Sequence, residues 1–285
     1  MKVKKLRRLN RSGGGDFGIN FVLVLFGLFM AFPLVYVVCQ ALKPMDEIFM
    51  YPPKFFVRNP TLTNFQDLFV IMGKSWVPFS RYIFNTVFIT AVGTAGHLLF
   101  ASMAAYVLAK YDFRGGETLS RIVVVSMMFS GYVTAIPNYL VISKLGWVDT
   151  YWAIIIPAFA SPMGLFLMKQ FMEGIPNSII EAAKIDGAGE FRIFAQIVFP
   201  MVKPAWLTLI IFSIQNLWNN RASNFIYSEE LKTLPNAFGQ IVSGGVARYG
   251  VGAAVTLFMM IVPLATFIFT QSNIIETMAT SGIKD

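Results

Sequence analysis

The chain is 285 residues long; 56% of its residues are hydrophobic and 13% are charged. One soluble core could not bury that much apolar surface, so the composition excludes an ordinary soluble domain and predicts that lipid solvates part of the chain. The net charge of +8 does not indicate nucleic-acid binding, because the basic residues cluster at the ends of apolar runs. The single cysteine, Cys39, excludes an intrachain disulfide and a multi-cysteine metal site, and we expect it to be a packing residue.

The first predicted element is a membrane span that follows a basic segment at residues 1–16. A basic segment before an apolar run can also belong to a secretory signal peptide. The apolar run at 17–41 is too long for a signal peptide, and no small-x-small cleavage pattern follows it. We therefore expect an uncleaved span preceded by a basic cytoplasmic tail.

Six apolar stretches are candidates for crossing a bilayer as helices, which takes about 20 residues each. They lie at 17–41, 81–110, 121–141, 151–171, 204–218 with some extension, and 250–271. The sequence shows no internal repeat or domain linker. The prediction is an all-α integral membrane protein with one six-helix domain over residues 17–271.

The distribution of Lys and Arg predicts the orientation of the spans. If the N-terminus lies in the cytoplasm, the segments on that side hold more basic residues than the external segments. We therefore expect both termini in the cytoplasm, with residues 272–285 as a C-terminal tail. The connections at 42–80 and 222–249 would be external, and several prolines in 42–80 argue against a long regular helix there.

The cytoplasmic connection at 173–203 contains signals for two short helices. Pro176 suits a first helical turn, and Ser178-x-x-Glu181 matches a capping box. The first helix should run to about Asp186 and end at Gly187, which permits positive φ.

Gly189 also permits positive φ, and a second short helix should begin near Glu190 and end before Pro200. Two short helices joined by a glycine turn would form a compact protrusion. The apolar surface of the first helix either packs on the protein's own helix ends or docks into a partner, and the physical pattern leaves both open.

Residues 181–188 have the sequence Glu-Ala-Ala-x-x-Asp-Gly-Ala, and Pro-x-x-Lys-Pro follows at 200–204. This motif, between the fourth and fifth spans, resembles the EAA loop of ABC-importer permeases. The resemblance implies a coupling helix seated in a cleft of a separate ATPase dimer, where Glu181 makes a polar contact and Gly187 supplies the turn. The residues implied in coupling are Glu181, Ala182, Ala183, Asp186 and Gly187.

The whole chain is similar to the maltose-type carbohydrate permeases, in particular the MalG-like partner, on its six spans, its proline-rich first external connection and its final segment. The ending Asn-Ile-Ile-Glu-Thr-Met-Ala-Thr-Ser-Gly-Ile-Lys-Asp resembles LplC/YtcP-type permeases. The resemblance implies a bacterial plasma membrane protein that works with a second, MalF-like permease, an extracellular or periplasmic binding protein and an oligosaccharide substrate.

ATP hydrolysis needs a phosphate-binding loop, Gly-x4-Gly-Lys-Ser/Thr. The only Gly-Lys-Ser, at 73–75, has Leu68 in place of the first glycine. We therefore expect no catalytic residue and no cofactor in this chain, with ATP and Mg bound by the partner ATPase. The only histidine, His97, cannot build a metal site alone, and we expect a buried, hydrogen-bonded imidazole.

Polar residues within the spans are candidates for a substrate path. In the third span Ser126, Ser130, Thr134 and Asn138 are spaced by four, which places them on one slowly drifting helix face that either packs or lines a path. The fifth span ends in four carboxamides around a tryptophan. These side chains should face either a wet cavity suited to sugars or external water. The candidate path residues are Asn138, Gln215, Asn216, Trp218, Asn219 and Asn220. The fifth-span segment departs from the Trp-Pro-containing segment common in the family, so no substrate contact is carried over there.

The external connection at 222–249 is rich in glycine and charge. In MalG-like permeases the corresponding loop reaches into the cleft of the binding protein, and the alternative is a solvated connector. The candidate binding-protein contacts are Asn236, Gly239, Arg248 and Tyr249.

Three other functions can be compared with this pattern. A permease of the same class for a peptide or polyamine would carry the same EAA loop. An intramembrane enzyme would need a cluster of His, Asp and Glu within the spans, and the sequence offers none. A secondary transporter would need a charged residue in mid-span to couple an ion, which is also missing.

Overall fold

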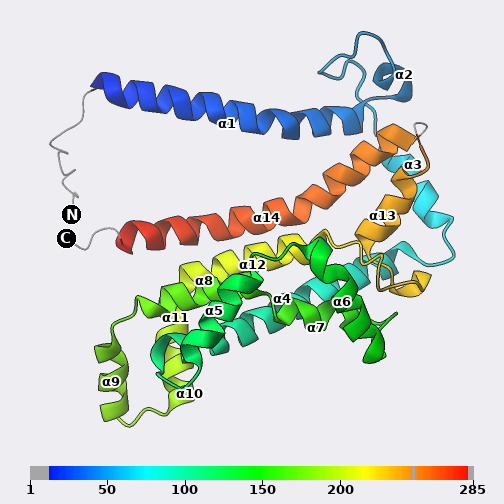
Figure 1. Ribbon diagram of the computed structural model, residues 1–285. Coiled ribbons are helices and arrows are strands. Elements are labelled where there is room, and N and C mark those ends of the chain that lie inside the picture. The colour runs from blue at the N-terminus through cyan, green and yellow to red at the C-terminus, as the bar shows by residue number, and fades with distance from the viewer. Residues whose placement is uncertain (1–12, 246–247, 282–285) are drawn as a thin grey trace. The chain divides into compact units, whose positions relative to one another are not determined.

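The computed structural model describes residues 13–245 and 248–281, and every regular element within them is helical. Figure 1 shows the order of these helices along the chain. Two compact units are present. The first contains the N-terminal residues up to Val70 together with Gly244–Leu257, and the second contains Ile71–Ser243 and the residues from Phe258 onward.

Four helical segments are long and apolar enough to cross a membrane: Phe17–Leu42, Phe79–Lys110, Trp152–Glu173 and Tyr249–Gln271. Two bent pairs pass the same test when each is taken as one span. These are Gly116–Ser126 with Gly131–Lys144, bent by 113°, and Glu190–Met201 with Lys203–Trp218, bent by 80°. The prediction of an all-helical membrane protein is confirmed, with four spans or up to six.

The first unit is built around α1 (Gly13–Leu42), whose apolar side chains are exposed from Phe17 onward, as lipid contact requires. A short helix, α2 (Met45–Ile48), and the start of α3 (Thr63–Gly73) follow it. The buried Asn64 side chain donates to the carbonyls of Ala41 at 2.9 Å and Lys43 at 2.7 Å. These bonds fold the proline-rich connection back onto the end of α1.

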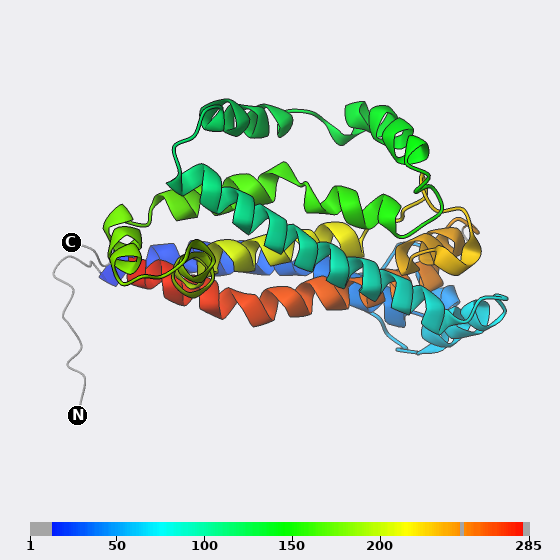
Figure 2. The same cartoon turned by 90° about the horizontal axis from the view of Figure 1, so that it is seen from below.

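The second unit is organised by α4 (Phe79–Lys110), which packs against α7 (Trp152–Phe159), α8 (Pro162–Glu173) and α12 (Lys203–Trp218). In Figures 1 and 2, α7 and α8 follow one another along α4, and α12 lies beside α4. Two glycines of α4 make this possible, because a Cβ would lie 2.6 Å from Leu217 at Gly93 and 2.0 Å from Phe159 at Gly96. The threonines and His97 of α4 therefore face protein.

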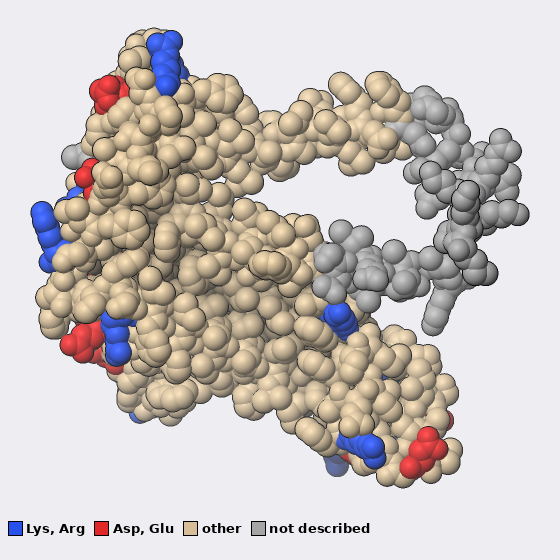
Figure 3. Space-filling view, turned by 180° about the vertical axis from the view of Figure 1, so that it is seen from behind, with Lys and Arg blue, Asp and Glu red and all other residues tan. Residues whose placement is uncertain are grey.

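The second unit contains further helices, some of which belong to the bent pairs. They are α5 (Gly116–Ser126), α6 (Gly131–Lys144), α9 (Asn177–Ile185), α10 (Glu190–Ile193), the π-helix η1 (Phe194–Val198), α11 (Phe199–Met201), the 3-10 helix η2 (Glu229–Leu231) and α13 (Leu234–Val242). The last helix, α14 (Tyr249–Ser281), contributes residues to both units. On the face shown in Figure 3, the surface is built mainly from uncharged residues, and the charged side chains form small separate groups.

The third predicted span is not one straight helix. The chain leaves helix after Ser126, and the Ser130 side chain accepts the Tyr132 N–H at 3.4 Å to start α6. Figure 2 shows the two helices joined by a short non-helical connection. Gly131 is a poor helix former, which favours a break in the span at this point. Serine favours the N-cap position, so a new helix starts after Ser130. The expectation that Ser126, Ser130, Thr134 and Asn138 share one helix face is therefore wrong.

Candidate functional site

The first candidate site is the protruding loop that contains α9 and α10. The helix α9 begins at Asn177, and Pro176 takes the extended N-cap conformation without any side-chain cap bond. Ser178 thus lies inside the first turn, so the predicted capping box with Glu181 does not form. The prediction of a capping box is therefore wrong, because an N-cap residue lies outside the helix and has an extended backbone conformation.

Gly187 ends α9 with a φ of +79°, as predicted. Its N–H donates to the Lys184 carbonyl at 3.0 Å, and the Ala188 N–H donates to the Ala183 carbonyl at 3.0 Å. This pair of bonds is the Schellman motif, which needs a left-handed residue at this position. Gly189 has an ordinary φ of −72° and does not supply a second left-handed turn.

The predicted coupling residues divide between two faces of α9. Glu181, Ala182 and Asp186 are exposed, together with the large apolar side chain of Ile185. Ala183 is buried with Ile180 in a cluster that includes Met172, Ile193 and Val198, so it packs on the protein's own helix ends. A partner could therefore contact the exposed face of α9 while the buried face still holds the helix against the rest of the protein.

The second short helix does not end before Pro200. Helical turns continue from Glu190 to Met201 through the π segment η1, and Pro200 lies in the first turn of α11. The π segment η1 directly precedes Pro200, so its missing N–H falls where the regular α-helical hydrogen-bond pattern is already interrupted.

The end of α4 holds both halves of the protruding loop. Lys110 Nζ donates to the Ile175 carbonyl at 2.5 Å and to Asn177 Oδ1 at 3.1 Å. The next residue, Tyr111, hydrogen-bonds Glu190 through its hydroxyl, and Lys184 pairs with Glu190 at 2.8 Å. The hydrogen bond to Glu190 raises the pKa of Lys184, so the pair is charged at neutral pH. A movement of α9 is thus linked to α4 through adjacent residues of one helix end.

The second candidate site is a cavity of about 400 Å³ within the second unit. It is lined by parts of α4, α6, α7, α8 and α12, and its polar lining residues are His97, Asn138, Ser161, Ser213, Asn216 and Asn220. Three predicted path residues, Asn138, Asn216 and Asn220, meet here from different parts of the sequence.

The other three predicted path residues do not line this cavity. Trp218 is buried on another side of α12, where its indole donates to the Met259 carbonyl at 3.0 Å. Gln215 is exposed, and Asn219 donates to the Gln215 carbonyl at 2.8 Å along its own helix. At about 100° per residue, positions four apart share a face and neighbouring positions do not, which separates these residues from Asn216 and Asn220.

His97 has the buried, hydrogen-bonded state that we predicted: its Nδ1 lies 2.6 Å from Ser213 Oγ. Its place in the cavity wall was not predicted. The only sequence signal was a histidine on the polar face of a span, which does not show what packs against it. Within the described part of the chain, no three His, Cys, Asp or Glu side chains are grouped as a metal site would require.

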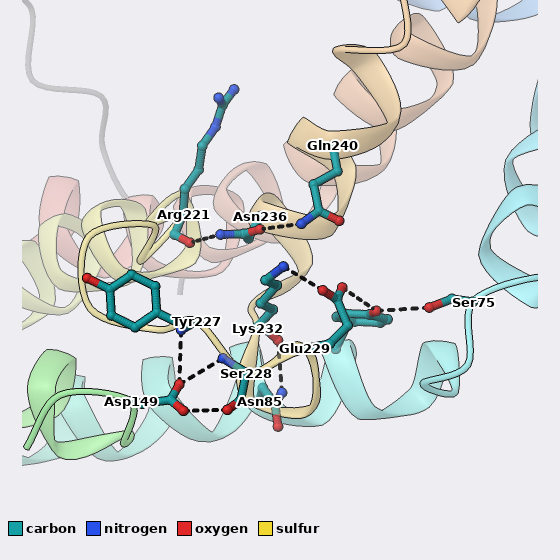
Figure 4. A network of polar contacts seen from close by, with 11 residues as sticks. Ser75, Asn85, Asp149, Arg221, Tyr227, Ser228, Glu229, Lys232, Asn236 and Gln240 are labelled. Carbon is teal, nitrogen blue, oxygen red and sulfur yellow. Dashed lines mark hydrogen bonds and ion pairs between the residues drawn. The ribbon is translucent and has the colours of Figure 1, made fainter.

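The connection at 222–245 is folded rather than an extended linker. The Asp149 carboxylate accepts the backbone N–H groups of Tyr227 and Ser228, each at 2.9 Å, and also the Ser228 hydroxyl (Figure 4). The Ser228 side-chain bond and these backbone bonds lower the pKa of Asp149, which stays ionised at neutral pH. The buried Asn85 donates to the carbonyls of Glu230 and Lys232, both at 2.8 Å.

The predicted binding-protein contacts fall in both units. In the second unit, Asn236 in α13 donates to the Arg221 carbonyl at 2.8 Å, and Gly239 lies beside the Arg221 side chain. In the first unit, the Arg248 side chain lies against Gly244, and Tyr249 is exposed at the start of α14. Asn236 and Gly239 are partly exposed on α13.

Residues 97–278 match the family model described as "Binding-protein-dependent transport system inner membrane component". The arabinooligosaccharides transport system permease protein AraQ of Halalkalibacterium halodurans is 29% identical over 270 residues, covering 93% of this chain and 95% of that protein. The polygalacturonan/rhamnogalacturonan transport system permease protein YtcP of Bacillus subtilis is 32% identical over 220 residues, covering 77% of this chain and 74% of that protein.

The fold also matches a solved structure, a bacterial ABC transporter involved in the import of the acidic polysaccharide alginate. The TM-score is 0.76 at 23% sequence identity, and the match covers 93% of this chain and 99% of that chain. This chain therefore shares its fold with that transporter chain.

Proposed function

This chain belongs to the family of inner membrane components of binding-protein-dependent transport systems, and from that membership we propose that it forms, with a second MalF-like permease, the membrane path for an oligosaccharide. The family is one of non-catalytic membrane subunits of ABC transporters, whose partners are an ATPase and a substrate-binding protein. The observation that carries the sugar assignment is the near full-length similarity to a permease named for arabinooligosaccharides.

The mechanism that we propose is alternating access driven from the protruding loop. An ATPase dimer closes on ATP and moves the outer face of α9, and the contacts of Lys110 and Tyr111 pass that motion to α4. Because α4 packs on α7, α8 and α12, its movement changes the walls of the cavity. In this proposal both termini lie in the cytoplasm, residues 1–16 and 272–285 are tails, and residues 173–203 form the coupling loop of the domain at 17–271.

Reconstitution tests the assignment. The chain in proteoliposomes with its second permease, ATPase and binding protein should take up oligosaccharide only with ATP, and the purified chain alone should hydrolyse no ATP. Labelled sugar uptake and phosphate release measure the two. Robust hydrolysis by the chain without partners would contradict the proposal, since the sequence has no phosphate-binding loop.

Cysteine cross-linking tests which partner touches which end. In a background with Cys39 replaced by alanine, Gly239→Cys should cross-link to the binding protein, and Ile185→Cys should cross-link to the ATPase. The Ile185 side chain is 86% exposed, and a Cβ at Gly239 meets only the end of the Arg221 side chain, so both variants should fold. Each variant is the control for the other. A cross-link from Gly239→Cys to the ATPase, or none to the binding protein in any nucleotide state, would count against the proposed orientation.

A further inference from the structure

The segment that follows α2 turns back along α1 instead of extending away from it (Figure 1). The ring of Phe55 stacks on Phe32 of α1 with 4.1 Å between the ring centroids, and its centroid lies 5.4 Å from that of Tyr36. Phe32 precedes the last residue of α1, Leu42, by ten positions. At a rise of about 1.5 Å per residue, Phe55 therefore lies about 15 Å back from the end of the helix.

This position on α1 lies within the membrane. The apolar span Phe17–Leu42 has 26 residues, which is about 39 Å of helix, whereas the hydrocarbon core of a bilayer is about 30 Å thick. If all of the excess lay beyond the core at the Leu42 end, the core would end near Tyr36, and Phe32 would still be about 6 Å inside it. The contact with Phe32 thus places the Phe55 ring at or within the boundary between lipid headgroups and acyl chains.

Backbone groups of this segment are paired within the chain, as surroundings with little water require. The buried Lys43 side chain donates through Nζ to the Lys54 carbonyl, and the buried Glu47 carboxylate accepts the Arg58 N–H at 2.7 Å. The two prolines at 52–53 have no N–H to satisfy. A loop in water would not need two buried charged side chains for this purpose, because solvent would pair the same backbone groups.

The outer surface of the same segment is aromatic and basic. Tyr51 is 92% exposed and Phe56 is 69% exposed. Two basic residues, Lys54 and Arg58, are their near neighbours in the sequence. Aromatic side chains are enriched at membrane–water interfaces, and long basic side chains near the end of a span extend to the headgroups. This surface therefore matches the boundary layer of a bilayer better than bulk water.

We propose that residues 49–58, the aromatic loop, anchor the end of α1 in the membrane interface. Tyr51 and Phe56 insert at the boundary between headgroups and acyl chains, and Lys54 and Arg58 contact lipid phosphates of the same leaflet. The first connection is then partly embedded in lipid instead of fully solvated. The proposal rests on α1 as a membrane span and not on the transported substrate, and it holds for either orientation of the chain, because both leaflets contain phosphates and acyl chains.

Fluorescence quenching on the complete transporter in proteoliposomes tests this anchor. The variant Phe56→Cys, with Cys39→Ala and with every other cysteine of the complex replaced, is labelled with the polarity-sensitive fluorophore NBD. A lipid that carries a nitroxide near the headgroup end of its acyl chain should quench most of the emission, and aqueous iodide should quench little of it. Asp67→Cys is the matched control, because Asp67 is an exposed charged residue of α3 in the same connection, and its label should show the reverse pattern.

Phe55→Ala tests the attachment of the aromatic loop to α1. It removes the ring that stacks on Phe32, so the label of Phe56→Cys should become accessible to iodide. Two outcomes would overturn the proposal. Equal quenching by iodide of the Phe56→Cys and Asp67→Cys labels would place the aromatic loop in water. Protection of the Phe56→Cys label from both quenchers would show that another subunit, such as the second permease, covers the loop in place of lipid.

Discussion

Gly187→Leu and Glu181→Lys should each abolish saccharide uptake while the membrane domain stays inserted and assembled with its second permease. Gly187 has a φ of +79°, where a leucine is strained by about 1–3 kcal/mol, which is too little to dismantle the domain. A Cβ at Gly187 would meet no described atom within 4 Å, so the added bulk points into open space and affects the docking face instead.

Glu181 is exposed and makes no capping bond, and its Coulomb attraction to Lys184 lies at the surface, so reversing its charge disturbs the fold little. The expected loss of uptake therefore comes from a weakened contact with the partner ATPase. Membrane abundance, ATPase co-purification and hydrolysis stimulated by the binding protein should be measured on the same preparations. Normal abundance with hydrolysis that no longer responds to the binding protein is the expected pattern.

Gly187→Asn is the control for the turn, because asparagine tolerates the left-handed conformation better than other residues with a Cβ. It should keep most of the wild-type uptake. If Gly187→Leu and Glu181→Lys both retain wild-type uptake and stimulation, this loop is not the coupling element. Poor insertion of both variants would show that the loop serves the fold instead.

Asn85→Leu should strongly destabilise the second unit where α4 holds the connection at 222–245. The Asn85 side chain is fully buried, and it donates to the carbonyls of Glu230 and Lys232 and accepts the Tyr151 hydroxyl at 2.7 Å. Leucine has a similar volume but satisfies none of these groups. Each buried group left unpaired costs about 1–3 kcal/mol, so the expected loss is about 3 kcal/mol or more.

For a domain of this size, such a loss corresponds to a decrease of roughly 6–12 °C in the melting temperature. Fluorescence-detected size-exclusion chromatography after heating measures it on the detergent-solubilised protein. Asn219→Leu is the matched control, since Asn219 is exposed and its one hydrogen bond lies within its own helix. A melting temperature of Asn85→Leu equal to that of the control would show that the network in Figure 4 does not hold the connection at 222–245.

The sequence was informative wherever a local physical requirement decides the structure. Four spans were located to within a few residues, because long apolar runs must be helical to satisfy their backbone groups in lipid. The end of α9 at Gly187 was also predictable, since the Schellman turn needs positive φ at one residue. The EAA motif can likewise be recognised from its own consecutive residues, without knowing which residues pack against it.

Predictions failed where two local signals competed. Both Pro176 and Ser178 suit a helix start, and the structure uses Pro176 as the cap, which leaves Ser178 within the helix. In the third predicted span the apolar composition indicated one helix, while Ser130 and Gly131 begin a new one. The apolar composition of a segment is an average over all its residues, so it does not show at which residue the backbone leaves the helix.

By itself, the sequence determined that this protein is an all-helical membrane permease with a protruding loop, because hydropathy and glycine conformation act over a few neighbouring residues. Only the tertiary structure decided which polar residues meet. Asn216 and Asn220 were separated from Gln215, Asn219 and Trp218 by the rotation of α12 against its neighbours, and His97 was brought to Ser213 across 116 positions of sequence. Such contacts depend on how close helices can approach, which Gly93, Gly96 and Gly164 permit only against the particular side chains that face them.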